Sequence, residues 1–221
     1  MNTCPICGGE GYIYQKDEQG YEFVQVCKCT LAQRLNKRLA NSGLINIQSH
    51  TMDQYKTDEA YQQRIKTVAE KYLQDQESPW FFIGGQVGCG KTHICTAICL
   101  ELINNGLSVR YEIWSSIAAR LKAMRNTEEF EMEMRRLQNV PTLYLDDFFR
   151  GWVSESDRSL AWELINGRYI QRRRTILSSE RYLFEISDID EAIGSRIQEM
   201  AGEYVCDVKR EPQRNKRMEE R

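Results

Sequence analysis

The chain has 221 residues, of which 41% are hydrophobic, which suits one domain of ordinary size with an appendage. Its formal net charge of -2 excludes a protein that coats nucleic acid with its whole surface. No apolar stretch approaches the length of a membrane span, and no basic-then-apolar signal segment opens the chain, so we expect a soluble cytoplasmic protein without a membrane partner.

The first 30 residues carry paired cysteines, Cys4-Pro-Ile-Cys7 and Cys27-Lys-Cys29. Four thiolates presented from two short loops suit tetrahedral Zn²⁺, and a chain without a secretion signal favours metal over disulfides. The alternative is four free thiols or a redox pair. We therefore expect residues 1–40 to form a zinc-binding head followed by a helix.

The next segment is polar and has a helical pattern. "LAQRLNKRLANSGL" spaces its leucines four residues apart, and Ser42-Gly43 predicts the end of that helix. "YQQRIKTVAEKYL" repeats the apolar spacing over 61–73. We expect residues 41–76 to form a helical linker.

From residue 77 onward, apolar runs alternate with amphipathic segments, which predicts an α/β fold with a parallel sheet flanked by helices. This core is expected to span 77–221 and to end in a basic tail. The strands are expected at 80–84, 108–114, 142–147 and 175–179, and the helices at 91–105, 116–124, 126–139 and 157–174.

One glycine-rich stretch, "GGQVGCGKTH", lies between the first of these strands and its helix, and it matches G-x-x-x-x-G-K-[ST]. Lys91 is expected to neutralise the β- and γ-phosphates of ATP, and the Thr92 hydroxyl to hold Mg²⁺. The alternative, a chance glycine turn, is disfavoured by the strand before it and the helix after it. The predicted nucleotide-binding residues are Gly85, Gln86, Val87, Gly88, Cys89, Gly90, Lys91, Thr92, His93 and Asp146.

An apolar strand in "TLYLDDFF" ends in two carboxylates. In P-loop ATPases, Asp146 would hold Mg²⁺ through water, and Asp147 would orient or deprotonate the attacking water. Alternation along a strand points the two carboxylates in different directions, which allows separate roles. The alternative is an ordinary Asp-Asp turn after a strand.

The order of these features resembles the DnaC/DnaI-type helicase loaders, AAA+ ATPases related to the IstB transposition helpers. The resemblance is carried by "GGQVGCGKTH", "LYLDDF", "ELINGRY", "TILSSE" and "IGSRIQEM", and it covers roughly residues 50–217. It implies an AAA+ type sheet and an ATP-dependent loader that delivers a hexameric replicative DNA helicase onto single-stranded DNA during replication initiation. ATP, Mg²⁺ and Zn²⁺ are the implied cofactors, and the cysteine head is similar to that of DnaI-type and phage loaders.

The resemblance also implies roles for single residues. Ser179 falls near the position that senses the γ-phosphate, but the chain reads "SSE", which leaves Ser179 and Glu180 as alternatives. Arg196 matches an arginine that reaches a neighbouring subunit's ATP, so ATP-bound chains are expected to oligomerise; the alternative is an exposed helical arginine. Arg214 matches a second sensing arginine. Tyr55 is expected either near the adenine or in the core.

Other functions stay open at this point. The chain could instead be an IstB-like transposition helper acting on duplex DNA, a small-molecule P-loop kinase, or an interaction protein with a degenerate ATP site. In the loader interpretation, the head and the helices of 31–76 bind the helicase. The basic run "QRRRT" is either a solvated face or a surface that contacts DNA phosphates, through Arg172, Arg173 and Arg174.

Overall fold

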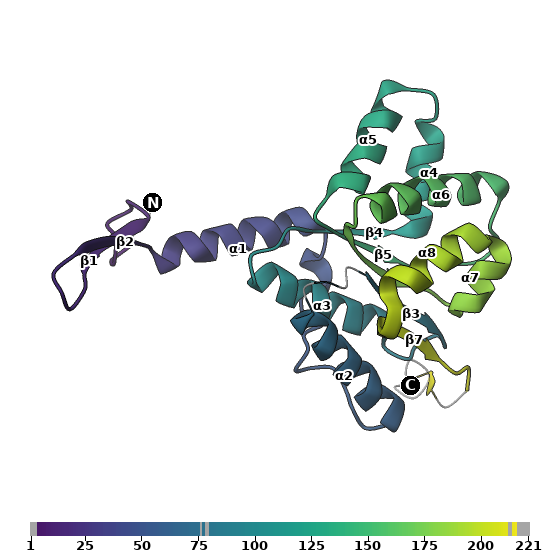
Figure 1. Cartoon of the computed structure of the whole chain (residues 1–221), viewed down its shortest axis with the longest axis horizontal. Helices are drawn as coiled ribbons and strands as arrows, with labels where there is room; N and C mark the ends of the chain where they lie inside the picture. The colour runs from purple at the N-terminus through teal and green to yellow at the C-terminus, as the bar shows by residue number, and fades with distance from the viewer. Residues whose placement is uncertain (1–3, 76, 78–79, 212–213, 216–221) are drawn as a thin grey trace.

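The molecule consists of a small head, a projecting helix and an α/β core (Figure 1). The computed structural model describes residues 4–75, 77, 80–211 and 214–215. Within these ranges no helix is both long and apolar enough to cross a membrane.

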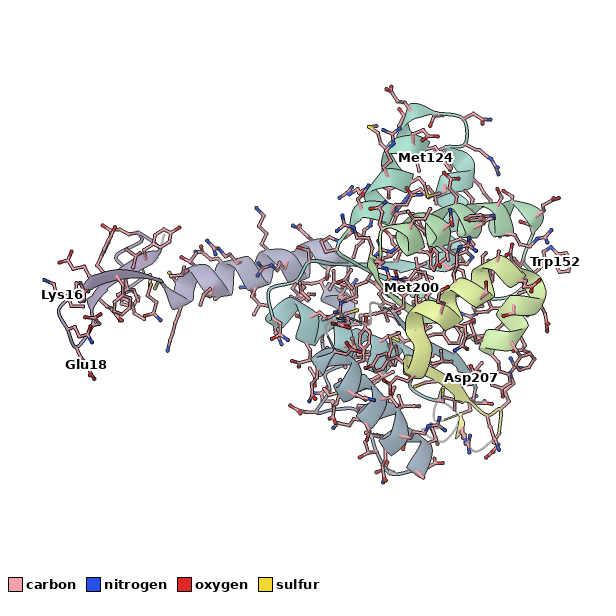
Figure 2. All side chains as sticks on the ribbon, in the orientation of Figure 1. Lys16, Glu18, Met124, Trp152, Met200 and Asp207 are labelled. Carbon is pink, nitrogen blue, oxygen red and sulfur yellow. The ribbon has the colours of Figure 1, made fainter. Side chains whose placement is uncertain are left out.

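The head is built on an antiparallel hairpin of β1 (Tyr12–Lys16) and β2 (Glu22–Val26), in which Tyr12 pairs with Val26. This hairpin was not predicted, although "YIYQK" and "EFVQV" both carry strand-forming residues. The hairpin brings the two cysteine pairs together at its base, because one pair precedes β1 and the other follows β2. Figure 2 shows Lys16 and Glu18 at the tip of the hairpin, far from the core.

Helix α1 (Lys28–Ser42) connects the head to the core. It ends where predicted, at Gly43, which adopts the left-handed conformation (φ 82°) that a helix C-terminus favours. The predicted boundary at residue 40 falls inside this helix, which is continuous to Ser42. Leu35 and Leu39 also pack against buried residues of the core.

The segment predicted as a helical linker, 41–76, is partly helical over its described residues, 41–75. They contain a short 3₁₀ helix, η1 (Ile45–Ile47), and α2 (Ala60–Gln74), which opens with a capping box between Glu59 and Gln62. The apolar stripe of α2 buries Ile65, Ala69 and Tyr72 against the core. A stripe of this kind is stable only when it is covered, so this segment forms part of the helical layer.

The predicted parallel sheet is confirmed, with the strand order β4-β5-β6-β3-β7. β7 was missed because it is short and pairs only with β3 at the edge of the sheet. The strands are β3 (Trp80–Gly85), β4 (Val109–Ile113), β5 (Thr142–Asp146), β6 (Arg174–Ser178) and β7 (Val205–Val208).

Helices cover both faces of this sheet, because alternate residues of each strand point to opposite sides. In β3, Trp80 and Phe82 face the side of α4 to α8, whereas Phe81 and Ile83 face α2 and α3. The remaining helices are α3 (Lys91–Asn104), α4 (Trp114–Ala123), α5 (Glu128–Asn139), α6 (Glu155–Ile170), α7 (Leu183–Ile189), α8 (Glu191–Ala201) and the 3₁₀ helix η2 (Gly202–Tyr204).

One predicted helix is too long. The helix expected over 157–174 ends at Ile170, because Arg172 adopts a left-handed conformation (φ 48°) that reverses the chain into β6. The five parallel strands all end at one edge of the sheet, which we call the carboxyl edge; the opposite one is the amino edge. Ligands of open α/β sheets bind outside the carboxyl edge, so the site is sought there.

Candidate nucleotide-binding site

The phosphate-loop residues lie at the carboxyl edge, between β3 and α3. Gly85, Gly88 and Gly90 have φ values of 106°, 75° and 93°, a region that other residues rarely adopt. Close packing adds a second restriction at Gly88, where a Cβ atom would lie 2.2 Å from Oδ1 of Asn215. The glycines of this loop are therefore required by the backbone itself. The N–H groups of Gly85 and Gln86 donate to the carbonyl oxygens of Ser179 and Val208, so an anion would be bound by N–H groups further along the loop.

Lys91 is the first residue of α3, and its side chain is folded back into the loop. Its Nζ donates hydrogen bonds to the carbonyl oxygens of Gly85 (3.1 Å) and Gln86 (2.7 Å). The side chain is almost fully buried, and no carboxylate forms an ion pair with it among the described residues. A buried ammonium group held only by carbonyls suits a site that receives negative charge from a ligand.

Asp146, at the end of β5, is held by hydroxyl groups from three strands and α3. Its Oδ1 accepts hydrogen bonds from Tyr144 (2.8 Å), Thr92 (3.3 Å) and Ser178, and its Oδ2 accepts one from Tyr111 (3.1 Å). Burial raises the pKa of both tyrosines, so their hydroxyls stay protonated as donors. The structure brings together Thr92 and Asp146, which were each predicted to hold Mg²⁺, whereas the three supporting hydroxyls were not predicted.

Asp147 lies just past the end of β5, so strand alternation, which predicted separate directions for the two carboxylates, does not set its side chain; it forms an ion pair with Arg150. Oδ2 of Asp147 lies 2.8 Å from Nη1 of Arg150, and Nε of the same arginine lies 3.3 Å from Oε1 of Glu180. Asp147 and Phe149 both have positive φ values (54° and 55°), which turn the chain sharply after β5. The buried side chain of Phe149 anchors this turn, and Asp147 and Arg150 stay close enough to pair.

A cavity of about 340 Å³ lies between these groups. Its walls include phosphate-loop residues, both aspartates, the predicted sensor candidate Glu180, and two side chains that were not predicted to bind nucleotide, His50 and Arg150. This volume is at the lower end of the range for small-molecule sites. Its polar lining, with cations beside carboxylates, suits a phosphate group together with a divalent cation.

The base of α3 is covered by an aromatic cluster. His93 and His50 meet edge to face at 4.8 Å, and the ring of Tyr55 lies 5.3 Å from His93. Nε2 of His93 lies 2.9 Å from the Thr51 carbonyl oxygen, and burial lowers the pKa of this histidine. Tyr55 itself is buried and contacts Gly90, where a Cβ atom would lie 3.0 Å from its ring. Tyr55 therefore packs in the core directly beside the phosphate loop, and its proximity to adenine stays a prediction.

The two candidates for sensing the γ-phosphate differ in position. The Ser179 hydroxyl is fully buried and donates to the Phe148 carbonyl (2.6 Å), whereas Glu180 lines the cavity. Arg214 lies near the loop but packs over the ring of Tyr61 (4.9 Å), and it is not part of the cavity wall.

Arg196, on α8, lies outside the cavity wall of its own chain. Its guanidinium is stacked on Trp162 (4.8 Å) and Tyr169 (5.1 Å), and its Nε donates to Asn166 (3.1 Å). These contacts hold the side chain against α6. An effect of Arg196 on ATP would thus have to act on the site of another copy.

The four head cysteines form the second predicted site. All four sulfur atoms lie within 4.8 Å of one another; Cys4 and Cys27 are 3.8 Å apart, and Cys7 and Cys29 are 3.5 Å apart. Sulfurs at the corners of a tetrahedron about 2.3 Å from a zinc ion would be about 3.8 Å apart, so the donor set fits this metal. A hydrogen bond from the Gly11 N–H to Cys7 lowers the pKa of that thiol to about 6, which favours a thiolate.

The three arginines of "QRRRT" do not act as one patch. Arg174 packs over the ring of Tyr72 at 5.1 Å, which is a structural contact. Arg172 is exposed and Arg173 half-buried, and both lie in the turn before β6, at the amino edge of the sheet.

Comparisons with known proteins agree with this geometry. The profile of the family described as IstB-like ATP binding protein matches residues 23–197. The phage-like element PBSX protein XkdC of Bacillus subtilis (strain 168) is 28% identical over 223 residues, which cover 93% of this chain and 82% of XkdC. Protein YqaM of the same organism is 27% identical over 199 residues, and the chain spans only 63% of the length of YqaM.

The crystal structure of the DnaC helicase loader has the same fold. It superposes with a TM-score of 0.65 and 22% sequence identity, and the match covers 73% of this chain and 97% of that one. The α/β architecture predicted from the residue pattern is thus the one found in a helicase loader.

Proposed function

The chain belongs to the family of IstB-like ATP-binding proteins, and we propose that it is an ATP-dependent loader that delivers a replicative DNA helicase onto single-stranded DNA. The observation that carries the proposal is the division of the molecule. The core holds a nucleotide site with both acidic residues, and α1 holds a four-cysteine head away from it (Figure 1). Such a division suits a switch, because one part reads the nucleotide while the other holds a partner. The fold shared with the DnaC helicase loader supports the same assignment.

At the nucleotide site we assign ATP phosphates to the loop and to Lys91. Thr92 and Asp146, whose oxygens lie 3.3 Å apart, would hold Mg²⁺, which would neutralise charge on the phosphates. Asp147 would orient the attacking water. Phosphate release should require both Lys91 and Asp147, whereas ATP binding should require Lys91 but not Asp147.

We assign Arg196 to the ATP of a neighbouring copy, because it lies outside its own cavity and is held rigidly by two rings. Such an arginine stabilises charge in the transition state and makes hydrolysis depend on assembly. The test mixes an Arg196→Ala chain with an Asp147→Asn chain. Each is inactive alone, and mixed assemblies should regain turnover, because the first chain keeps its catalytic acid and the second keeps its arginine. Turnover that is independent of protein concentration and of Arg196 would contradict this assignment.

We further propose that the head binds one structural Zn²⁺ through its four cysteines. Elemental analysis of purified protein should find about one zinc per chain. A variant with Cys4→Ser and Cys7→Ser should lose the metal and keep ATP binding, whereas Cys206→Ser, in β7, should keep both. Folded protein without zinc would contradict the proposal.

The loading function is tested by capture of a purified hexameric replicative helicase, with ATP and without it. We expect capture by the wild-type chain to depend on the nucleotide, and capture by Lys91→Ala to be the same in both conditions. The double cysteine variant should capture less helicase under both conditions, since we assign the partner contact to the head and α1. No capture by the wild-type chain under either condition would contradict the loader assignment.

The family itself favours a second candidate, a transposition helper of the IstB type. That function predicts ATP-dependent binding to duplex DNA and to a transposase, with no capture of the helicase. A small-molecule kinase has no support from the family match. It would be indicated by phosphate transfer to an acceptor at a rate that does not change with protein concentration.

A further inference from the structure

Helix α1 carries four basic residues and no acidic one. Three of them, Arg34, Lys37 and Arg38, line a cavity of about 280 Å³ where the helix meets the start of β4. Its other walls are Asn41, Ser108 and Val109, so no carboxylate lines it.

These three cations are not neutralised within the protein. In the described part of the chain, none of them forms an ion pair with a carboxylate. Three positive charges around one hollow repel one another unless an anion is present. The arrangement therefore suits an anionic ligand more than a purely structural role.

A second basic cluster lies on the same edge of the sheet. Val109 of β4 pairs with Thr142 of β5, and Thr142 pairs with Arg174 at the start of β6. The turn that holds Arg172 and Arg173 is thus two strand spacings from the α1 cavity, about 10 Å. Together the two clusters form a basic amino edge, on the opposite side of the sheet from the nucleotide cavity.

The far end of α1 adds exposed aromatic side chains. Tyr14 and Tyr21 of the hairpin are 72% and 71% exposed. The hairpin tip is itself acidic, so it offers surfaces for stacking rather than contacts to phosphates. A helix of 15 residues is about 22 Å long, so one flexible strand could reach both the rings and the basic edge.

We propose that the basic amino edge binds the phosphodiester backbone of single-stranded nucleic acid, while the hairpin tyrosines stack with its bases. Proteins bind single strands through cations that follow the backbone and exposed rings that stack with the bases. The bases of a duplex are not available for such stacking. The inference deepens the proposed function, because it names the surface through which the loader would hold the strand.

The test measures binding of a labelled oligothymidylate to the full chain by fluorescence anisotropy over a range of salt concentrations. The variant replaces Arg34, Lys37 and Arg38 with glutamine. The plot of log K against log salt has a negative slope, and loss of three phosphate contacts should reduce its magnitude by about 2. Binding should weaken on the order of 50-fold at about 0.15 M salt. Arg172→Gln with Arg173→Gln should reduce the magnitude of the slope by about 1.

A matched control removes three exposed arginines elsewhere, by Arg64→Gln, Arg125→Gln and Arg158→Gln. Its slope should stay at the wild-type value, which separates the site from an effect of net charge. Tyr14→Ala with Tyr21→Ala should weaken binding by about fivefold or more without changing the slope. The inference is overturned if the α1 variant and the control lose affinity equally, or if a duplex of the same length binds as tightly as the single strand.

These results are distinguishable from failure of the proposed function. A wild-type chain that captures helicase but binds no oligonucleotide overturns this inference and leaves helicase capture intact. A chain that binds oligonucleotide through the basic amino edge but captures no helicase overturns the loader assignment and supports this inference.

Discussion

Arg168 on α6 is the largest buried charge in the core, and its removal tests how the amino edge is held together. The side chain is fully buried, and it reaches the end of α5 on one side and the start of β6 on the other. Its N–H groups donate hydrogen bonds to Thr175 Oγ1 (2.9 Å) and to the carbonyl oxygens of Leu137 (2.6 Å), Gln138 (3.2 Å), Val140 (3.0 Å) and Arg174. Burial lowers the pKa of Arg168 to about 9, so it stays charged at neutral pH.

The substitution Arg168→Met keeps the length of the side chain and removes every donor. Each buried acceptor left without a partner costs about 1–3 kcal/mol, but relief of the desolvation of the charge offsets part of the sum. We therefore expect a loss of about 3–5 kcal/mol in the free energy of unfolding. For a chain of this length, that loss lowers Tm by about 6–20 °C.

The assay is urea unfolding at neutral pH, with the midpoint and the m-value fitted separately. The midpoint should fall while m stays unchanged, because the unfolded surface is the same. Arg158→Met is the matched control, since Arg158 lies on the same helix but is exposed, and it should change stability by less than about 0.5 kcal/mol. If Arg168→Met unfolds within about 1 kcal/mol of the wild type, the hydrogen bonds of Arg168 do not hold this edge together.

Three further predictions concern the nucleotide site. Asp147→Asn should keep ATP affinity and lower phosphate release by about 10²-fold or more, measured in single turnovers; an unchanged rate would remove Asp147 from the chemistry. Arg150→Ala should weaken ATP binding about tenfold, measured by titration with ATP, because it removes a permanent cation from the cavity wall. The same change should alter the free energy of unfolding by less than about 1 kcal/mol, because the ion pairs of Arg150 are half-exposed. Because the pKa of His93 is lowered in the folded chain, the unfolded chain binds more protons than the folded chain below about pH 6.5. The stability that neutral His93 contributes is therefore present above that pH and lost as pH falls through it. Between about pH 7 and pH 5, Tm should therefore fall less steeply in His93→Gln than in the wild type, and equal slopes would contradict the linkage.

The phosphate loop could be predicted from the sequence because the glycines, the lysine and the threonine that define it lie in eight consecutive residues. A strand, a glycine turn and a helix fix that geometry locally, so distant parts of the chain are not needed to interpret it. The strand that ends at Asp146 could likewise be predicted, whereas Asp147 lies past it in a turn of positive φ, and both carboxylates line the same cavity.

Other wall residues were missed because they come from separate loops. His50 lies more than 30 residues before the loop, and Arg150 lies more than 50 residues after it. Hydrophobic spacing predicts which face of a helix is buried, but it does not predict where two loops meet. One feature of the sequence did point to Arg150: an arginine three residues after Asp147 can turn back and form an ion pair with that carboxylate.

Arg168 had a signal as well. It follows Leu160, Ala161, Leu164 and Ile165 on the apolar stripe of α6, at the spacing of the next buried position. A charged residue at such a position is buried with partners or disrupts the helix. The partners are carbonyls at the end of another helix, which no residue pattern in the sequence identifies.

The end of α1 and the nucleotide site contact one common side chain, Tyr111 of β4. A Cβ atom at Gly43 would lie 3.2 Å from the Tyr111 carbonyl oxygen, so the helix ends directly on this strand. The Tyr111 hydroxyl donates to Asp146 at 3.1 Å, and its ring lies 5.1 Å from that of Tyr144. Because packed interiors do not absorb small shifts, a movement of Asp146 on binding the proposed Mg²⁺ would be passed to Tyr111 as well as to its other hydroxyl partners. The junction at Gly43, rather than the distant hairpin, is therefore where nucleotide state and head position can affect each other.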